Sequence, residues 1–140
     1  MPHPASLAAL PPVIVVHAIF ALSALLLGPA ALWARKGSRL HRGAGYAWVT
    51  LMLGAAVSSL FIRDFRLPNL AGYTPIHLLT LVTFAGVGLG LYFIARRQVS
   101  SHRRWMRATY FGACIGAGLF ALLPGRYLGD LVWHHALRLA

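Results

Sequence analysis

Four histidines lie at positions from which they could bind a metal. His17 and His77 each lie near the start of a long apolar run, and His41 and His102 each precede an arginine at the start of another. Neutral imidazole is a standard axial ligand for haem iron, and an ionisable side chain inside an apolar span is by default a functional candidate. The four histidines therefore form the candidate site, and the helices that carry them decide which of them can meet.

The apolar runs around these histidines are long enough to cross a membrane. Hydrophobic residues make up 59% of the 140 residues, and only 11% are charged. A helix needs about 20 apolar residues to cross the hydrocarbon core, where every backbone group must bond within its own segment. We predict an all-α integral membrane protein, a four-helix up-down bundle in one domain over residues 1–140. Its helices are expected at 12–34, 41–62, 75–95 and 102–123.

Positive charge is distributed unequally around these helices. Nine Lys and Arg lie beside the connections that follow the first and third helices, and four lie on the opposite side. Because positive loops stay in the cytoplasm, we expect a multi-pass protein of a bacterial inner membrane with both termini on the outer side. Anionic membrane lipid accounts for the net charge of +11. The sequence has no aromatic-basic pattern for nucleic acid, and we expect no nucleic-acid partner.

The two halves of the sequence repeat each other. Residues 16–17 (Val-His) align with 76–77 (Ile-His) at an offset of 60, and 41–42 (His-Arg) align with 102–103 (His-Arg) at an offset of 61. Each half contains an even number of spans, so the second copy has the same orientation as the first. We therefore predict two tandem helical hairpins with one histidine pair near each membrane face.

The bundle geometry decides which histidines form a pair. In an up-down bundle with short connections, the first and third helices lie diagonally across the core, as do the second and fourth. Neighbouring helices pack at about 8–10 Å, which makes the diagonal roughly 12–14 Å. Two imidazoles cannot touch across that gap, but both can ligate a flat macrocycle between them. We expect His17 with His77, and His41 with His102, to be the axial metal ligands of one or two molecules of haem b.

A haem would also need space and cationic partners for its propionate groups. Small residues follow His17 at helical spacing, and residues expected to form apolar walls and a gap follow His77: Ala21, Ala24, Gly28, Leu81, Phe84 and Gly88. Cations near the membrane surface are expected to bind the propionates. The candidate cofactor-binding residues are Arg42, Arg103 and Arg104 on the inner side and, on the outer side, Arg126 with Arg66 and Tyr73.

Each of these features also has a purely structural interpretation. His41 and His102 fit the lipid head-group region, and His17 fits a neutral imidazole that bonds neighbouring backbone or Thr80. The glycines of the third and fourth helices favour close helix packing over clearance for a cofactor. These are Gly86, Gly88, Gly90, Gly112 and Gly116.

The most specific segments are HRGAGYAW (41–48), HRRWMRATYFG (102–112) and PGR (124–126), together with His77 near the start of a span. They resemble a family of small predicted four-helix bacterial membrane proteins of unknown function. The resemblance covers nearly the whole chain and implies the fold but little chemistry. By position alone, the four histidines are also similar to the axial ligands of di-haem b-type cytochromes, whose alternate helices supply two layers of histidines.

Two functions fit these patterns. The first is a b-type cytochrome-like protein that carries electrons across or within the inner membrane, with a quinone or a redox partner protein. Such a protein would be a membrane oxidoreductase or an electron-transfer subunit. The alternative is a non-redox subunit of a larger complex, a homo-oligomer or an assembly factor that acts through helix faces and lipid. The sequence has no Glu, and both Asp lie outside the predicted spans, so we assign no catalytic residue.

Overall fold

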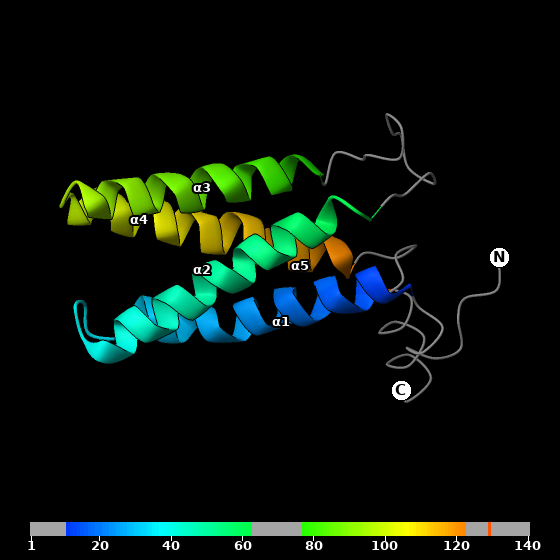
Figure 1. Cartoon of the computed structure of the whole chain (residues 1–140), viewed down its shortest axis with the longest axis horizontal. Coiled ribbons are helices and arrows are strands. Elements are labelled where there is room, and N and C mark those ends of the chain that lie inside the picture. The colour runs from blue at the N-terminus through cyan, green and yellow to red at the C-terminus, as the bar shows by residue number, and fades with distance from the viewer. Residues whose placement is uncertain (1–10, 63–76, 123–128, 130–140) are drawn as a thin grey trace.

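The computed structural model describes residues 11–62, 77–122 and 129, and it contains four helical rods. The helical segments are α1 (Pro12–Trp33), α2 (Arg39–Ser59), α3 (Leu78–Ala95), α4 (Val99–Thr109), the π-helical η3 (Tyr110–Ile115) and α5 (Gly116–Ala121). The last three follow one another without a break and form the fourth rod (Figure 1). The prediction of an all-α four-helix fold is confirmed. The second and fourth rods begin at Arg39 and Val99, a few residues before the predicted starts at 41 and 102.

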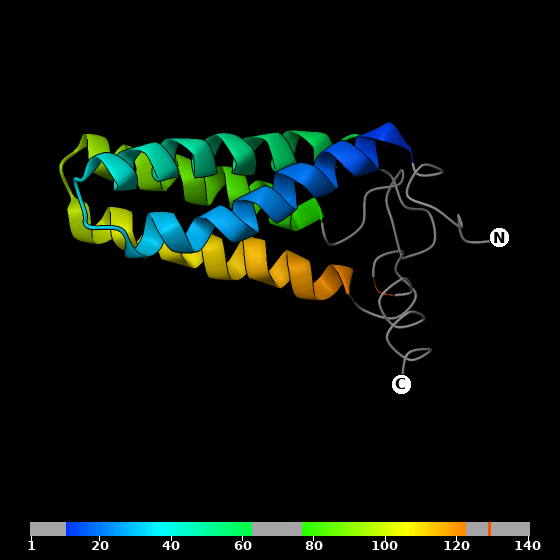
Figure 2. The same cartoon turned by 90° about the horizontal axis from the view of Figure 1, so that it is seen from below.

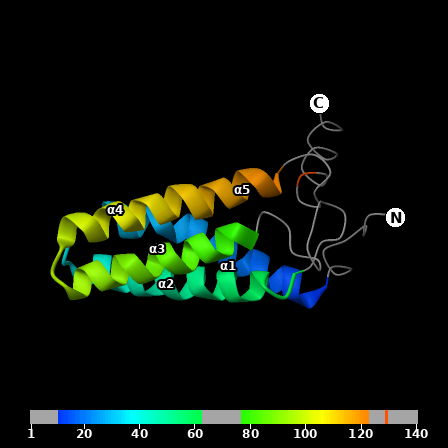
Figure 3. The ribbon, with the colours of Figure 1, turned by 90° about the horizontal axis from the view of Figure 1, so that it is seen from above.

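The rods are arranged as two hairpins, as the sequence repeat predicts. α1 packs along α2, and α3 packs along α4. The two tight connections lie at the same end of the bundle, which Figures 1 and 2 show from two sides. The hairpins meet where α2 contacts α3 and where η3 contacts α1. α1 therefore lies diagonally opposite α3, and α2 lies diagonally opposite α4 (Figure 3).

The end that holds both connections carries all nine Lys and Arg of the described residues, and we call it the basic end. These nine are Arg35, Lys36, Arg39, Arg42, Arg96, Arg97, Arg103, Arg104 and Arg107. Gly37 turns the first connection in the left-handed region at φ 79°, and the hydroxyl of Ser38 caps α2 by accepting from the backbone N–H of His41 at 3.1 Å. Because the cap fixes the first turn of α2, it also fixes the position of His41.

In the part of the chain that the structure describes, two helices, α1 and α3, are long and apolar enough to cross a membrane. Both are apolar on all sides and leave large side chains on their outer surfaces, such as Leu26 on α1. A helix with no polar face needs an apolar environment all round it. The other two rods carry arginines near their starts, such as Arg39 on α2 and Arg103 on α4.

The middle of the bundle is filled by aromatic packing. The rings of Trp48 on α2 and Tyr110 on η3 lie 6.4 Å apart at 57°. Ala24, Met52, Val87 and Ala113 complete the buried cluster. The core therefore separates the basic half of the bundle from the half that contains His17 and His77.

Pro29 explains how Tyr110 is held in this core. Proline has no backbone N–H, so the carbonyl of Leu25, four residues earlier, loses its helical hydrogen bond. The hydroxyl of Tyr110 donates to that carbonyl at 2.9 Å. Gly28 lies against the Tyr110 ring, and a Cβ there would overlap the ring. The π-helical segment begins at Tyr110 itself, and π-helical turns often occur at functional positions.

The expected apolar wall below His77 is wrong. The side chains of Leu81 and Phe84 are 64% and 37% exposed, and a Cβ on Gly88 would meet open space. The buried face of α3 instead contains Thr80, Thr83, Gly86, Val87 and Gly90. This buried face begins at Thr80, three residues after His77, whereas the predicted wall begins at Leu81, four residues after it. Of the residues expected below His17, Ala24 is buried, and the space beside Gly28 is taken by Tyr110.

Gly86 and Gly90 let α3 approach α4 closely. A Cβ on Gly86 would overlap Thr109 Oγ1, and one on Gly90 would overlap the end of Met106. The packing interpretation is therefore correct at these two glycines. It is wrong for Gly88 and Gly112, where an added Cβ meets nothing within 4 Å.

Candidate functional site

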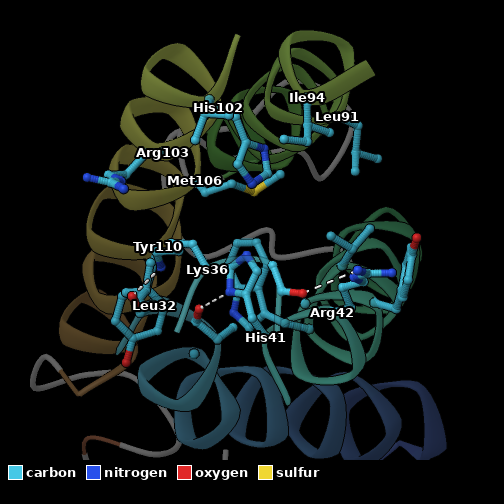
Figure 4. Close-up of a pocket in the computed structure, with 18 residues that line it drawn as sticks. Leu32, Lys36, His41, Arg42, Leu91, Ile94, His102, Arg103, Met106 and Tyr110 are labelled. Atoms are coloured by element: carbon cyan, nitrogen blue, oxygen red, sulfur yellow. Dashed lines mark hydrogen bonds between the residues drawn. The ribbon is translucent and has the colours of Figure 1, made fainter. Parts of the chain in front are cut away.

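A cavity of about 520 Å³ lies among the four rods in the basic half of the bundle. Its walls are mostly apolar, and its volume is within the roughly 300–1,000 Å³ of small-molecule and cofactor sites. His41 from α2 and His102 from α4 both line it. Figure 4 shows them on opposite sides of the cavity. These two of the four predicted ligands are thus brought to one site from diagonal helices.

The hydrogen bond of His41 determines which ring nitrogen is available. Its Nδ1 lies 2.8 Å from the carbonyl oxygen of Ala31 on α1. A carbonyl can only accept, so Nδ1 carries the proton and donates, and in the neutral ring Nε2 then keeps its lone pair. Histidines that ligate metals almost always donate their other ring N–H in this way to a carbonyl or a carboxylate.

His102 repeats this arrangement in the second hairpin. Its Nδ1 donates to the carbonyl oxygen of Gly90 on α3 at 2.8 Å. Each histidine is therefore oriented by the partner helix of its own hairpin, and each keeps an Nε2 lone pair. This is the state that an axial haem ligand requires.

The depth of the cavity is set by residues one and two turns along from the histidines. Gly45, one turn after His41, leaves open space, and Met106 occupies the same position after His102. Trp48 and Tyr110 line the deep end. The indole Nε1–H of Trp48 is buried and has no hydrogen-bond partner among the described residues.

Cationic side chains also line the cavity. Lys36, Arg42 and Arg103 line it, whereas Arg104 is exposed and lies away from it. The Lys36 ammonium donates to the carbonyl of Leu32 at 2.5 Å. Burial lowers the pKa of Lys36, and the positive charges of Arg103 and Arg107 lower it further. The site is thus electropositive and would favour an anionic group on its ligand.

His17 and His77 lie in the other half of the bundle and do not line this cavity. His17 Nδ1 lies 2.9 Å from the carbonyl oxygen of Ala55 and 3.0 Å from Ser58 Oγ, both on α2. His77 donates from Nε2 to the carbonyl oxygen of Ile62 at 2.9 Å. Both histidines therefore bond the end of the α2 segment. The expected alternative partner of His17, Thr80, instead bonds the hydroxyl of Ser59 at 2.7 Å.

The remaining predicted outer-side residues, Arg126 with Arg66 and Tyr73, lie outside the described residues. Within residues 11–62 and 77–122 no group of three or more His, Cys, Asp or Glu could hold a metal ion. Porphyrin-bound iron needs only axial ligands, and two histidines can supply them.

A family model described as "Predicted membrane protein (DUF2306)" matches residues 14–130. The chain belongs to this family. The resemblance to a family of predicted membrane proteins of unknown function, inferred from the two His-Arg segments, is thereby confirmed. Among the described residues, α1 and α3 are the two candidate spans. No curated protein and no solved structure matches it. The similarity to di-haem cytochromes stays a prediction based on position.

Sequence reasoning missed most of the residues that line the cavity, among them Gly45, Trp48, Met106 and Tyr110. A signal for them was present. Positions four and seven after His41, and four and eight after His102, fall on the same helix face as the histidine. The π-helical start at Tyr110 shifts the register of the fourth rod, and nothing in the sequence indicates it.

Proposed function

We propose that this chain is a b-type cytochrome-like membrane protein that holds haem b in the cavity between His41 and His102. The observation that carries the proposal is their shared chemistry. They lie on diagonal helices, line one cavity, and each donates its Nδ1–H to a backbone carbonyl. Two oriented imidazoles with free Nε2 lone pairs match the requirement of bis-histidine ligation.

The other lining residues suit such a ligand. Gly45 leaves clearance beside His41, Met106 and Tyr110 supply apolar contact, and Arg42 and Arg103 are placed for propionate groups. The bundle would keep water away from the iron and would hold the imidazoles in place. The chemistry that bound haem supplies is reversible one-electron transfer. Arg104 lies away from the cavity, so it is not part of the proposed haem site.

The proposed setting is a bacterial inner membrane, with the basic end in the cytoplasm and both termini outside. The nine cations at that end support this orientation through the positive-inside rule. A quinone or a redox partner protein would exchange electrons with the haem. The pair His17 and His77 is a second candidate ligand pair, and its bonds to the end of the α2 segment favour a structural role.

The test is the absorption spectrum of protein purified from cells with adequate haem supply. We expect a Soret band and a low-spin spectrum from one haem per chain. His41→Ala and His102→Ala should each abolish the low-spin signal, because one axial ligand is lost. His17→Ala should leave the spectrum unchanged, and a fall from two haems to one in that variant would show that the outer pair is also a ligand pair.

A second pair of variants separates loss of haem from loss of the fold. Gly45→Leu fills the cavity and should reduce haem content at least tenfold with the helix content unchanged. Gly43→Leu is the control, since Gly43 lies on the same helix in open space and does not line the cavity. Haem-free protein after adequate haem supply, or full binding in both histidine variants, would refute the proposal and favour the non-redox alternative.

A further inference from the structure

Three cations from two elements gather on one side of the basic end. Arg103 and Arg107 are four residues apart, so they lie on one face of α4. Lys36 comes from the connection between α1 and α2, and both arginine charges act on it. Lys36 and Arg103 also line the cavity, as Figure 4 shows, whereas Arg107 lies outside it.

No carboxylate of the described residues balances these charges, because neither Asp of the chain lies within residues 11–62, 77–122 or 129. The only hydrogen bond recorded for the three cationic groups in those ranges joins Lys36 to the carbonyl of Leu32. Like charges held close together repel each other unless an anion lies between them. The cluster is therefore complementary to an external anion.

The surroundings indicate what kind of anion it is. Trp33, in the last turn of α1 and three residues before Lys36, is 75% exposed, and tryptophan is enriched at the head-group level of membranes. Further into the span, on the same face of α1 as Trp33, the side chains of Leu26 and Leu22 are exposed. A polar anionic head beside the cations and an apolar chain along α1 are the two parts of one phospholipid molecule.

We infer that Lys36, Arg103 and Arg107 form a binding site for the phosphate of an anionic phospholipid at the basic end. Basic clusters between membrane helices on the cytoplasmic side are a known means of holding such head groups. The site shares Lys36 and Arg103 with the lining of the cavity, whereas Arg107 contributes to the charge cluster and does not line the cavity. Variants of Arg107 therefore test the lipid site apart from haem binding.

The experiment measures lipid selectivity by electron paramagnetic resonance in reconstituted membranes. Spin-labelled phosphatidylglycerol is compared with spin-labelled phosphatidylcholine. We expect the wild-type chain to prefer phosphatidylglycerol. Arg107→Gln and Lys36→Gln should each reduce that preference by about fivefold, the equivalent of about 1 kcal/mol per cation at a membrane surface. Arg104→Gln is the matched control, since Arg104 is an exposed neighbour of equal charge that does not line the cavity.

Three other results would show that the three cations do not form a phospholipid site. Equal losses in Arg104→Gln and Arg107→Gln would show only a diffuse surface charge and would overturn the site. Loss of selectivity in inorganic phosphate, but not in chloride of the same ionic strength, would assign the cluster to free phosphate. Loss of selectivity on haem loading would assign it to propionate. Helix content measured by circular dichroism confirms that each variant is folded.

Discussion

At the scale of single residues, His41 and His102 each use one ring nitrogen to join two helices and present the other to the cavity. The sequence predicts that these two histidines pair, because the repeat places them at matching depths on diagonal helices. It does not predict which nitrogen is protonated. That choice depends on the carbonyls of Ala31 and Gly90, which become neighbours only when each hairpin closes.

Lys36 gives a prediction at this scale, because it is the single lysine of the sequence. Burial and the charges of Arg103 and Arg107 hold its pKa below the ordinary value in the folded chain. A lowered lysine pKa means that folding disfavours the protonated form. The folded state should therefore gain stability as pH rises through the lowered pKa, and the gain is complete above the unfolded pKa.

The measurement is the rate of Lys36 acylation against pH in uncharged detergent, followed by peptide mapping. Arg107→Gln removes one repelling charge, so it should shift the profile to higher pH. Arg104→Gln should leave the profile in place. Identical profiles in wild type and Arg107→Gln would contradict the electrostatic cause.

At the scale of helices, the lengths and order of the rods follow from the apolar runs, but the faces they bury do not. α1 and α3 are apolar on every side, so their sequences carry no periodicity that marks an inner face. The close approach of α4 decides which face of α3 is buried. Gly86 and Gly90 admit α4, which turns Leu81 and Phe84 outward. The predicted wall failed because it was placed from the apolar character of Leu81 and Phe84, whereas the buried face of α3 is set by the glycines that fit against α4.

Gly86 and Gly88 provide a matched test on one helix. Gly86→Ala forces its Cβ against Thr109 Oγ1 and should destabilise the fold by about 1–3 kcal/mol, the usual cost of overpacking. Gly88→Ala meets open space and should stabilise α3 by about 0.5–1 kcal/mol, through the better helix propensity of alanine. Reversible unfolding in mixed detergent measures both changes. Equal effects of the two substitutions would show that α3 and α4 do not pack as described.

At the scale of the whole molecule, the two hairpins have the same direction, and their connections lie at one end. The sequence predicts this arrangement well, because each half has two spans and the positive residues cluster between them. It predicts the cavity less well. The cavity exists because Gly45 leaves space that Trp48 and Tyr110 do not fill, and Tyr110 is placed by a hydrogen bond to a carbonyl that Pro29 leaves free.

Orientation in the membrane is testable with one engineered cysteine. Gln98 is exposed in the connection between α3 and α4, so Gln98→Cys in a Cys114→Ala background places a single thiol at the basic end. A membrane-impermeant maleimide should label inverted inner-membrane vesicles and leave intact spheroplasts unlabelled, because the positive end is expected in the cytoplasm. Labelling in intact spheroplasts alone would reverse the proposed topology. The Cys114→Ala chain is the background control.

Each hairpin completes its own histidine–carbonyl bond, and this has a consequence for biogenesis. When translation has delivered only the first hairpin to the bilayer, the imidazole of His41 can already be oriented by Ala31. The opposite wall is still absent until residues 99–121 have left the ribosome. If the cavity binds haem as proposed, binding can be completed only after the second hairpin is in place, and a nascent chain that stalls after α2 would carry one of the two proposed ligands.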